Sequence, residues 1–133
     1  MFRPELLHDA MQAVCDAVLE SIQPRSAADA APRSAAGVVA SVADKADSLL
    51  GLAAAGCLPT ASADAFGMRR IMYGLLQTLI SSGTRASVSA LFAAAAAAQP
   101  VDCGEDVQAA VREFCARRLE QLCLLYTSPS PRD

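Results

Sequence analysis

Apolar residues recur along this chain at the spacing of an α-helix, and no stretch alternates at the two-residue spacing of a β-strand. The periodicity predicts helices over residues 5–22, 36–55, 64–82, 86–98 and 104–122. We therefore expect an all-α fold, a bundle of about five helices. The clearest apolar stripe lies on the third helix and consists of Met68, Ile71, Met72, Leu75, Leu76, Leu79 and Ile80.

Two further helices carry an apolar face at the same spacing. On helix 5–22 the residues that share a face are Leu7, Met11, Val14, Val18 and Ile22. On helix 36–55 the expected buried stripe is Val39, Val42, Ala46, Leu49, Leu50 and Ala53. Asp64 is expected to begin the third helix, with its carboxylate accepting hydrogen bonds from first-turn amides.

Composition limits which functions the chain can have. Its formal charge is −3, so it is no general binder of polyanions, and any RNA contact must come from a local group of arginines. The five cysteines form no Cys-x-x-Cys pair and there is one histidine, so we expect no metal site. No uncharged run is apolar enough to predict a membrane segment.

The last eleven residues, 123–133 (CLLYTSPSPRD), differ from the rest of the chain. Read as codons, they match a transposase adapter used in short-read library preparation. We therefore expect a non-native tail and a reading frame cut off near Leu122, and we exclude the tail from the fold prediction. A natural Ser/Pro-rich tail is the alternative.

Three motifs follow one another between residues 42 and 74. They read Ala-Asp-Lys-Ala-Asp at 43–47, Gly-Cys-Leu-Pro-Thr at 56–60 and Asp-Ala-Phe-Gly-Met-Arg-Arg at 64–70. Their order and spacing resemble the β subunit of heterotetrameric, bacterial-type glycyl-tRNA synthetase, over about residues 13–122. The chain departs from the family pattern at Ala28 and Ala61, where the family has Gly, and at Ala65, where it has Pro.

The resemblance implies a division of the chain and a function. Residues 1–83 would be part of an HD-like helical domain, and residues 84–122 the truncated start of an anticodon-binding helical domain. The implied activity of the whole enzyme is ATP-dependent charging of tRNA with glycine, which uses ATP and Mg in the α subunit. This chain would contribute tRNA binding and assembly, with no catalytic residue and no cofactor of its own.

The resemblance also implies partners and a compartment. The partners would be the α subunit or an α region and glycine tRNA, with no DNA and no membrane. The compartment would be the cytoplasm in a bacterium, and a plastid or mitochondrion in a eukaryote. Tyr73-Gly74-Leu75 and the run 117–122 look closest to organellar members.

Acidic residues around a lysine form the first candidate site: Asp44, Lys45 and Asp47, with Asp64 nearby in the sequence. We expect a structural polar cluster in which Asp44 or Asp47 reaches the connection at residues 25–33. Acid–base catalysis is the alternative, and it would require a shielded cleft and perturbed pKa values.

Arginines form the second set of candidates, as tRNA contacts: Arg69, Arg70, Arg112, Arg117 and Arg118. For Arg69 and Arg70 the alternative is ion pairing within the chain, one of them bracing the Asp44/Asp47 face. For Arg112, Arg117 and Arg118 on helix 104–122, the alternative is that they belong to a solvated face. In that case Glu113 would pair with Arg117 one turn further along the helix.

Two other function classes are weighed against this interpretation. His8-Asp9, together with Asp44 or Asp47, suggests a metal-dependent HD phosphohydrolase, but Ser21 stands where the HD-like pattern has histidine. The other class is a small helical adaptor, which would bind no RNA.

Overall fold

Within residue 1 and residues 3–127, which the computed structural model describes, the chain forms five α-helices and no strand. The prediction of an all-α fold is confirmed. The helices are α1 (Pro4–Ser21), α2 (Ala35–Ala54), α3 (Met68–Ser82), α4 (Val88–Ala98) and α5 (Glu105–Thr127).

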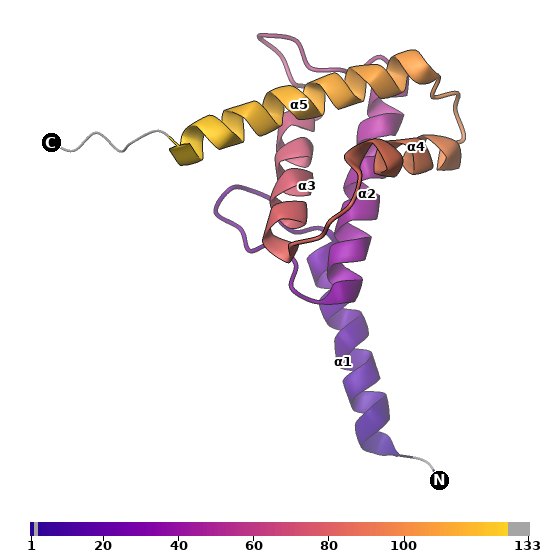
Figure 1. The fold of residues 1–133 in the computed structure, drawn as a ribbon. Helices are drawn as coiled ribbons and strands as arrows, with labels where there is room; N and C mark the ends of the chain where they lie inside the picture. The colour runs from indigo at the N-terminus through magenta and orange to yellow at the C-terminus, as the bar shows by residue number, and fades with distance from the viewer. Residues whose placement is uncertain (2, 128–133) are drawn as a thin grey trace, which may run out of the picture.

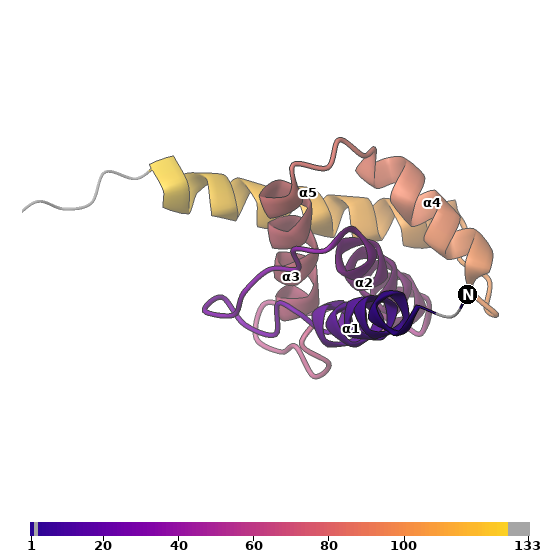
Figure 2. The ribbon, with the colours of Figure 1, turned by 90° about the horizontal axis from the view of Figure 1, so that it is seen from below.

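Four of the helices form the body of the molecule. Helices α2 and α3 run side by side, α5 lies across them near one end, and α4 packs against α2 and α5 (Figure 1). Viewed from below, α1 lies beside α2, and α5 crosses behind α2 and α3 (Figure 2). Helix α1 extends away from the body on the side opposite α5.

A single apolar core joins α2, α3, α4 and α5. Its most buried large side chains are Leu49, Leu50, Met68, Met72, Leu75, Phe92 and Val111. Because Phe92 and Val111 lie beyond residue 83 and pack with residues before it, the core spans the domain boundary predicted at residues 83–84. The division into two family domains stays a prediction.

Helix α1 contributes nothing to this core, although its apolar face is regular. It has no buried residue, and Met11 and Val14 are 60% and 63% exposed. Leu7, Val18 and Ile22 of the same face are also exposed. The C-terminal part of α1 lies against α2, with Glu20 and the following Gln23 bonded to residues 34–45, while the first turns project from the body.

The face of α2 predicted to be buried is correct in its second half and wrong at its start. Ala46, Leu49, Leu50 and Ala53 are buried as expected, whereas Val39 is 68% exposed. Ser41 and Lys45 are buried instead. The first turns of α2 face the end of α1 and its following loop, whose carbonyl groups need polar partners.

Helix α3 begins at Met68, four residues later than predicted. Gly67 has a positive φ of 66°, which favours glycine and ends the turn that precedes the helix. The predicted role of Asp64 is nevertheless confirmed, because its carboxylate accepts hydrogen bonds from the Met68 and Arg69 amides at 2.8 and 3.0 Å.

Helix α5 continues to Thr127, past the predicted end at Leu122. The first five residues of the proposed non-native tail are therefore helical in the structure. Residues 128–133 of that tail lie outside the described residues, and its origin stays a prediction.

Candidate functional site

The third motif, residues 64–70, builds the connection between α2 and α3 together with Thr60 of the second motif. Asp64 caps α3, the Ala63 amide donates to the Thr60 hydroxyl, and the Arg69 guanidinium donates to the Thr60 carbonyl. Arg69 is therefore directed at its own loop and does not meet the Asp44/Asp47 face. These contacts give the third motif a structural role.

Lys45 is the most unusual residue of the first motif, because it is charged and only 5% exposed. Its Nζ donates to the Gln23 carbonyl and to the Ser41 hydroxyl, each at 2.7 Å. The Ser41 hydroxyl in turn donates to the same carbonyl at 2.6 Å. Burial lowers the pKa of Lys45 from its ordinary value, and the nearby Asp44 carboxylate opposes this shift.

Gly74 on α3 makes room for this lysine. A Cβ at Gly74 would lie 2.9 Å from Lys45 Cε and 3.1 Å from the Pro24 carbonyl oxygen. Both distances are shorter than an ordinary carbon contact. The absence of a side chain at Gly74 therefore lets the lysine stem and the loop pack directly against α3.

Glu20, which the sequence analysis did not single out, fixes the other end of the α1–α2 loop. Its carboxylate accepts hydrogen bonds from the Arg33 amide at 3.0 Å, the Ser34 amide at 3.1 Å and the Ser34 hydroxyl. These bonds lower the pKa of Glu20. A carboxylate at the start of α2 is also favoured by the helix dipole. The sequence did not reveal this role, because Glu20 lies 14 residues before Ser34.

The same loop holds an ion pair, in which Arg25 Nε contacts Asp29 at 2.8 Å. Hydrogen bonds from Arg25 lower the pKa of Asp29 to about 2. Lys45 and Glu20, rather than Asp44 or Asp47, thus make the polar contacts that hold the connection between α1 and α2.

A pocket opens beside Lys45, between the α1–α2 loop, α2 and α3. Its volume is ≈ 290 Å³, and we call it the Lys45 pocket. Arg25, Asp44, Lys45 and Arg70 are its charged residues. The remaining residues that line it are Ile22, Pro24, Ser48 and Ile71. The three segments that meet here are far apart in the sequence.

The four residues of the predicted polar cluster do not form one group in the structure, although Asp44 and Asp47 both line a hollow between α2 and α4. Asp44 is exposed at the Lys45 pocket, and Asp64 caps α3. Asp47 instead contacts the end of α4, where Gln99 Nε2 donates to its carboxylate at 2.5 Å and to its carbonyl at 3.0 Å. Lys45 and Asp44 therefore share a pocket that Asp47 and Asp64 do not line.

The arginines of α5 make contacts along their own helix. Arg112 pairs with Glu105, and Arg117 pairs with Glu113 as predicted. Arg118 lies over the Phe114 ring, 5.6 Å from its centre, an arrangement typical of a cation–π contact. Arg70, by contrast, is exposed, and its side chain makes no hydrogen bond or ion pair with another described residue.

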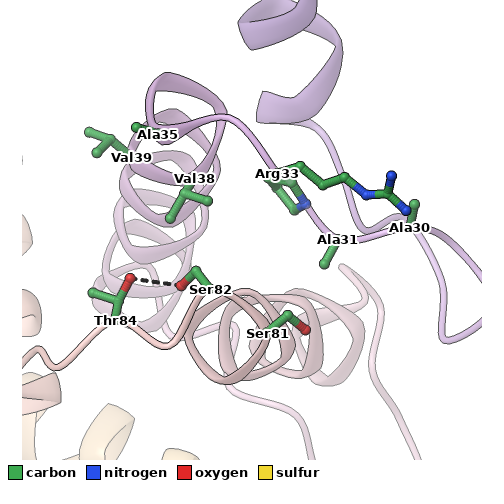
Figure 3. A pocket seen from close by; sticks show the side chains of 10 residues that line it. Ala30, Ala31, Arg33, Ala35, Val38, Val39, Ser81, Ser82 and Thr84 are labelled. Carbon is green, nitrogen blue, oxygen red and sulfur yellow. Dashed lines mark hydrogen bonds between the residues drawn. The ribbon is translucent and has the colours of Figure 1, made fainter.

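A larger hollow, ≈ 750 Å³, lies between the α1–α2 loop, the start of α2 and the end of α3. Figure 3 shows that its walls are mostly alanine and valine side chains, with the Ser82 and Thr84 hydroxyls bonded to each other. The Arg33 guanidinium points along the loop and away from these hydroxyls. No charged group is directed into this hollow from the residues that Figure 3 labels.

Metal-ligating side chains do not gather in the described part of the chain. No three His, Cys, Asp or Glu residues there are close enough to hold a metal ion. His8 and Asp9 lie on the exposed, projecting part of α1. None of the helices in residues 3–127 is both long and apolar enough to cross a membrane.

Comparison with known proteins gives one consistent result. The sequence profile of the family described as "Glycyl-tRNA synthetase beta subunit" matches residues 6–127. The chain is 40% identical over 109 residues to "Glycine--tRNA ligase, chloroplastic/mitochondrial 2" of Arabidopsis thaliana, which covers 82% of this chain and 10% of that protein.

Bacterial relatives are also similar. Identity is 36% over 107 residues to the "Glycine--tRNA ligase beta subunit" of Rhodospirillum centenum, covering 80% of this chain and 15% of that protein. Identity to the "Glycine--tRNA ligase beta subunit" of Moorella thermoacetica is 34% over 125 residues, covering 86% of this chain and 18% of that protein. The chain thus spans less than a fifth of these relatives' length. The match to the family profile nevertheless covers nearly all of the chain. By that match, the chain belongs to the glycyl-tRNA synthetase β-subunit family.

Proposed function

We propose that this chain is the part of a glycine–tRNA ligase β subunit that binds and positions tRNA and supports assembly with the α subunit. The observation that carries this proposal is the family match over residues 6–127. Residues 1–83 would belong to an HD-like domain and residues 84–122 to the start of an anticodon-binding domain.

The chemistry of charging is assigned to the α subunit or α region. ATP and Mg would act there, because the described residues of this chain hold no group of carboxylates suited to a metal and the sequence has no Gly-rich phosphate loop. We derive no catalytic step on this chain. The names of the Arabidopsis and bacterial relatives support an organellar or bacterial setting, and we favour the organelle because of the similarity to the Arabidopsis protein.

The five candidate arginines differ in how free they are to meet RNA. Four of them already contact groups within the chain: Arg69, Arg112, Arg117 and Arg118. Arg70 is exposed at a pocket with two other cations and is the first candidate for a phosphate contact. Arg117 remains a candidate, since its exposed ion pair with Glu113 exchanges easily for a phosphate contact. Arg118 also remains a candidate, although it lies against the Phe114 ring.

Binding of fluorescently labelled glycine tRNA to the purified chain tests the proposal. Fluorescence anisotropy at 50 and at 200 mM salt should show binding that weakens as salt rises, because phosphate contacts release counterions. Arg117→Ala and Arg118→Ala should weaken binding further. No binding even at 50 mM salt would contradict tRNA binding by this chain and favour the helical adaptor.

A further inference from the structure

Charge at the Lys45 pocket differs in sign from charge over the whole chain. Three cations, Arg25, Lys45 and Arg70, line the pocket together with one carboxylate, that of Asp44, whereas the chain carries a formal charge of −3. Arg25 is neutralised in part by its ion pair with Asp29. A local excess of positive charge in an acidic protein indicates a place that attracts anions.

The hydrogen bonds of Lys45 add a second observation. A buried ammonium group is normally paired with a carboxylate, because taking a charge out of water is expensive. Here, among the described residues, its two hydrogen-bond partners are neutral, the Gln23 carbonyl and the Ser41 hydroxyl. An ammonium group has three N–H donors, so one donor of Lys45 remains for a ligand.

Arg70 supplies an exposed cation at the rim of the same pocket. It follows Arg69, which is held by the Thr60 carbonyl, while Arg70 itself is exposed and engaged with no other described side chain. Its guanidinium can therefore meet a phosphate without first breaking an internal ion pair. This distinguishes it from Arg112 and Arg117 on α5.

Asp44 narrows the chemistry of the ligand. A site for a bare phosphate gains nothing from a carboxylate, which repels an anion. An ionised carboxylate accepts hydrogen bonds, and a nucleotide offers donors beside its phosphate in the ribose 2′-hydroxyl and the base amino groups. The volume, ≈ 290 Å³, is at the small end of ligand pockets, about 300 Å³, which suits one nucleotide rather than a duplex.

We propose that the Lys45 pocket binds one nucleotide of the tRNA. Arg70 and the free donor of Lys45 hold its phosphate, and Asp44 accepts a hydrogen bond from its sugar or base. This inference rests on the proposed function and deepens it by naming the contact. The three segments of the pocket would then be fixed relative to one another by Lys45, which ties the loop to α2.

The test compares the affinity of the full chain for labelled glycine tRNA among four proteins at several salt concentrations. Arg70→Ala should weaken binding about tenfold and lower the magnitude of the salt slope by about one, as expected for one lost phosphate contact. Arg70→Lys should keep the slope, because it keeps the charge. Arg85→Ala is the matched control, since Arg85 is an exposed arginine that does not line the pocket.

Asp44→Ala, as a fifth protein, distinguishes the binding of a nucleotide from the binding of a simple anion. If Asp44 accepts a hydrogen bond from the nucleotide, its removal weakens binding without changing the salt slope. Tighter binding would show that Asp44 only repels the ligand and would overturn its assigned role. Circular dichroism checks that each variant keeps its helices.

Two outcomes would overturn the inference, and they can be told apart. If the wild-type chain binds tRNA in a salt-sensitive way but Arg70→Ala binds like Arg85→Ala, the pocket is not the contact and the proposed function stands. If the wild-type chain does not bind tRNA at any salt concentration, the proposed function and the pocket fail together.

Discussion

Helices α1 and α3 carry the same kind of apolar pattern, but the apolar face of α3 is buried and that of α1 is exposed. On α3, Met72 and Leu75 are fully buried in the core. On α1, Met11 and Val14 have the same helical spacing and more than half of each remains exposed. The comparison teaches that periodicity identifies which face of a helix is apolar, and that whether the face is covered depends on what lies opposite.

The two helices are also held by different forces. Helix α3 packs against α2 and α5 through apolar side chains, so its stability comes from burial. The end of α1 and the following loop are held by hydrogen bonds of Glu20, Ser41 and Lys45. A substitution in the apolar core and a substitution in the hydrogen bonds of the loop should therefore have different effects on the protein.

The largest effect is expected in the core. Leu75→Ala removes a fully buried side chain and should lower the free energy of unfolding by about 2–5 kcal/mol. Urea unfolding followed by circular dichroism measures it. Met11→Ala is the matched control on α1 and should change the free energy by less than about 0.5 kcal/mol. Equal losses in the two variants would contradict the contrast between the helices.

A smaller effect is expected where Lys45 holds the loop. Lys45→Met keeps most of the apolar stem but removes both hydrogen bonds, and should lower the free energy of unfolding by about 1–3 kcal/mol. The loop should also open more often, so trypsin should cut faster after Arg25 and Arg33. Ser48→Ala serves as the control, because among the described residues the Ser48 side chain makes no hydrogen bond to the loop. An unchanged cutting rate would show that Lys45 does not hold the loop.

Acid should release the α1–α2 connection before it affects the core. The folded-state pKa values of Glu20 and Asp29 lie below their ordinary values of 4.5 and 3.8, that of Asp29 at about 2. Such carboxylates contribute stability that is fully present above the ordinary pKa and is lost as pH falls through the folded value.

The measurement is the urea midpoint of the wild-type chain and of Glu20→Gln between pH 6 and pH 2. The advantage of the wild type should be full near pH 6 and should shrink as pH falls below 4.5. A difference that stays constant over this range would contradict a charged, hydrogen-bonded role for Glu20.

The smallest effect is expected on the projecting part of α1. Val14→Ser replaces an exposed apolar side chain and should change the free energy of unfolding by less than about 0.5 kcal/mol, at any protein concentration. Sedimentation and urea unfolding at two concentrations check this. A loss above 1 kcal/mol that grows with concentration would show that a second copy covers this face in solution.

Much of the fold was predictable, because local signals agreed with one another. The stripe on α3 and the cap at Asp64 follow from side chains a few residues apart, and both were confirmed, except that Ile80 at the end of the stripe is 60% exposed. The start of α3 was misplaced because the turn that ends at Gly67 depends on its positive φ. Val39 was misplaced because the neighbour of α2 at that turn is a loop, which sequence periodicity does not reveal.

The candidate site was less predictable. The sequence placed Asp44, Lys45, Asp47 and Asp64 in one polar group, since they are close along the chain. In the structure Asp47 contacts Gln99 of the segment after α4, 52 residues away, and Lys45 contacts Gln23, 22 residues away. Partners at such separations are chosen by packing, and one sequence carries no direct record of them.

By itself, then, the sequence determined the secondary structure, the apolar faces of the helices and the resemblance to a family, because each is encoded in residues that are neighbours along the chain. Only the tertiary structure decided that α1 projects uncovered, that Lys45 is buried between neutral partners, and that Arg25, Asp44 and Arg70 line one pocket with it. The physical reason is that burial and charge proximity are properties of surfaces brought together by folding, and the three segments that form this pocket meet only once α2 and α3 have packed.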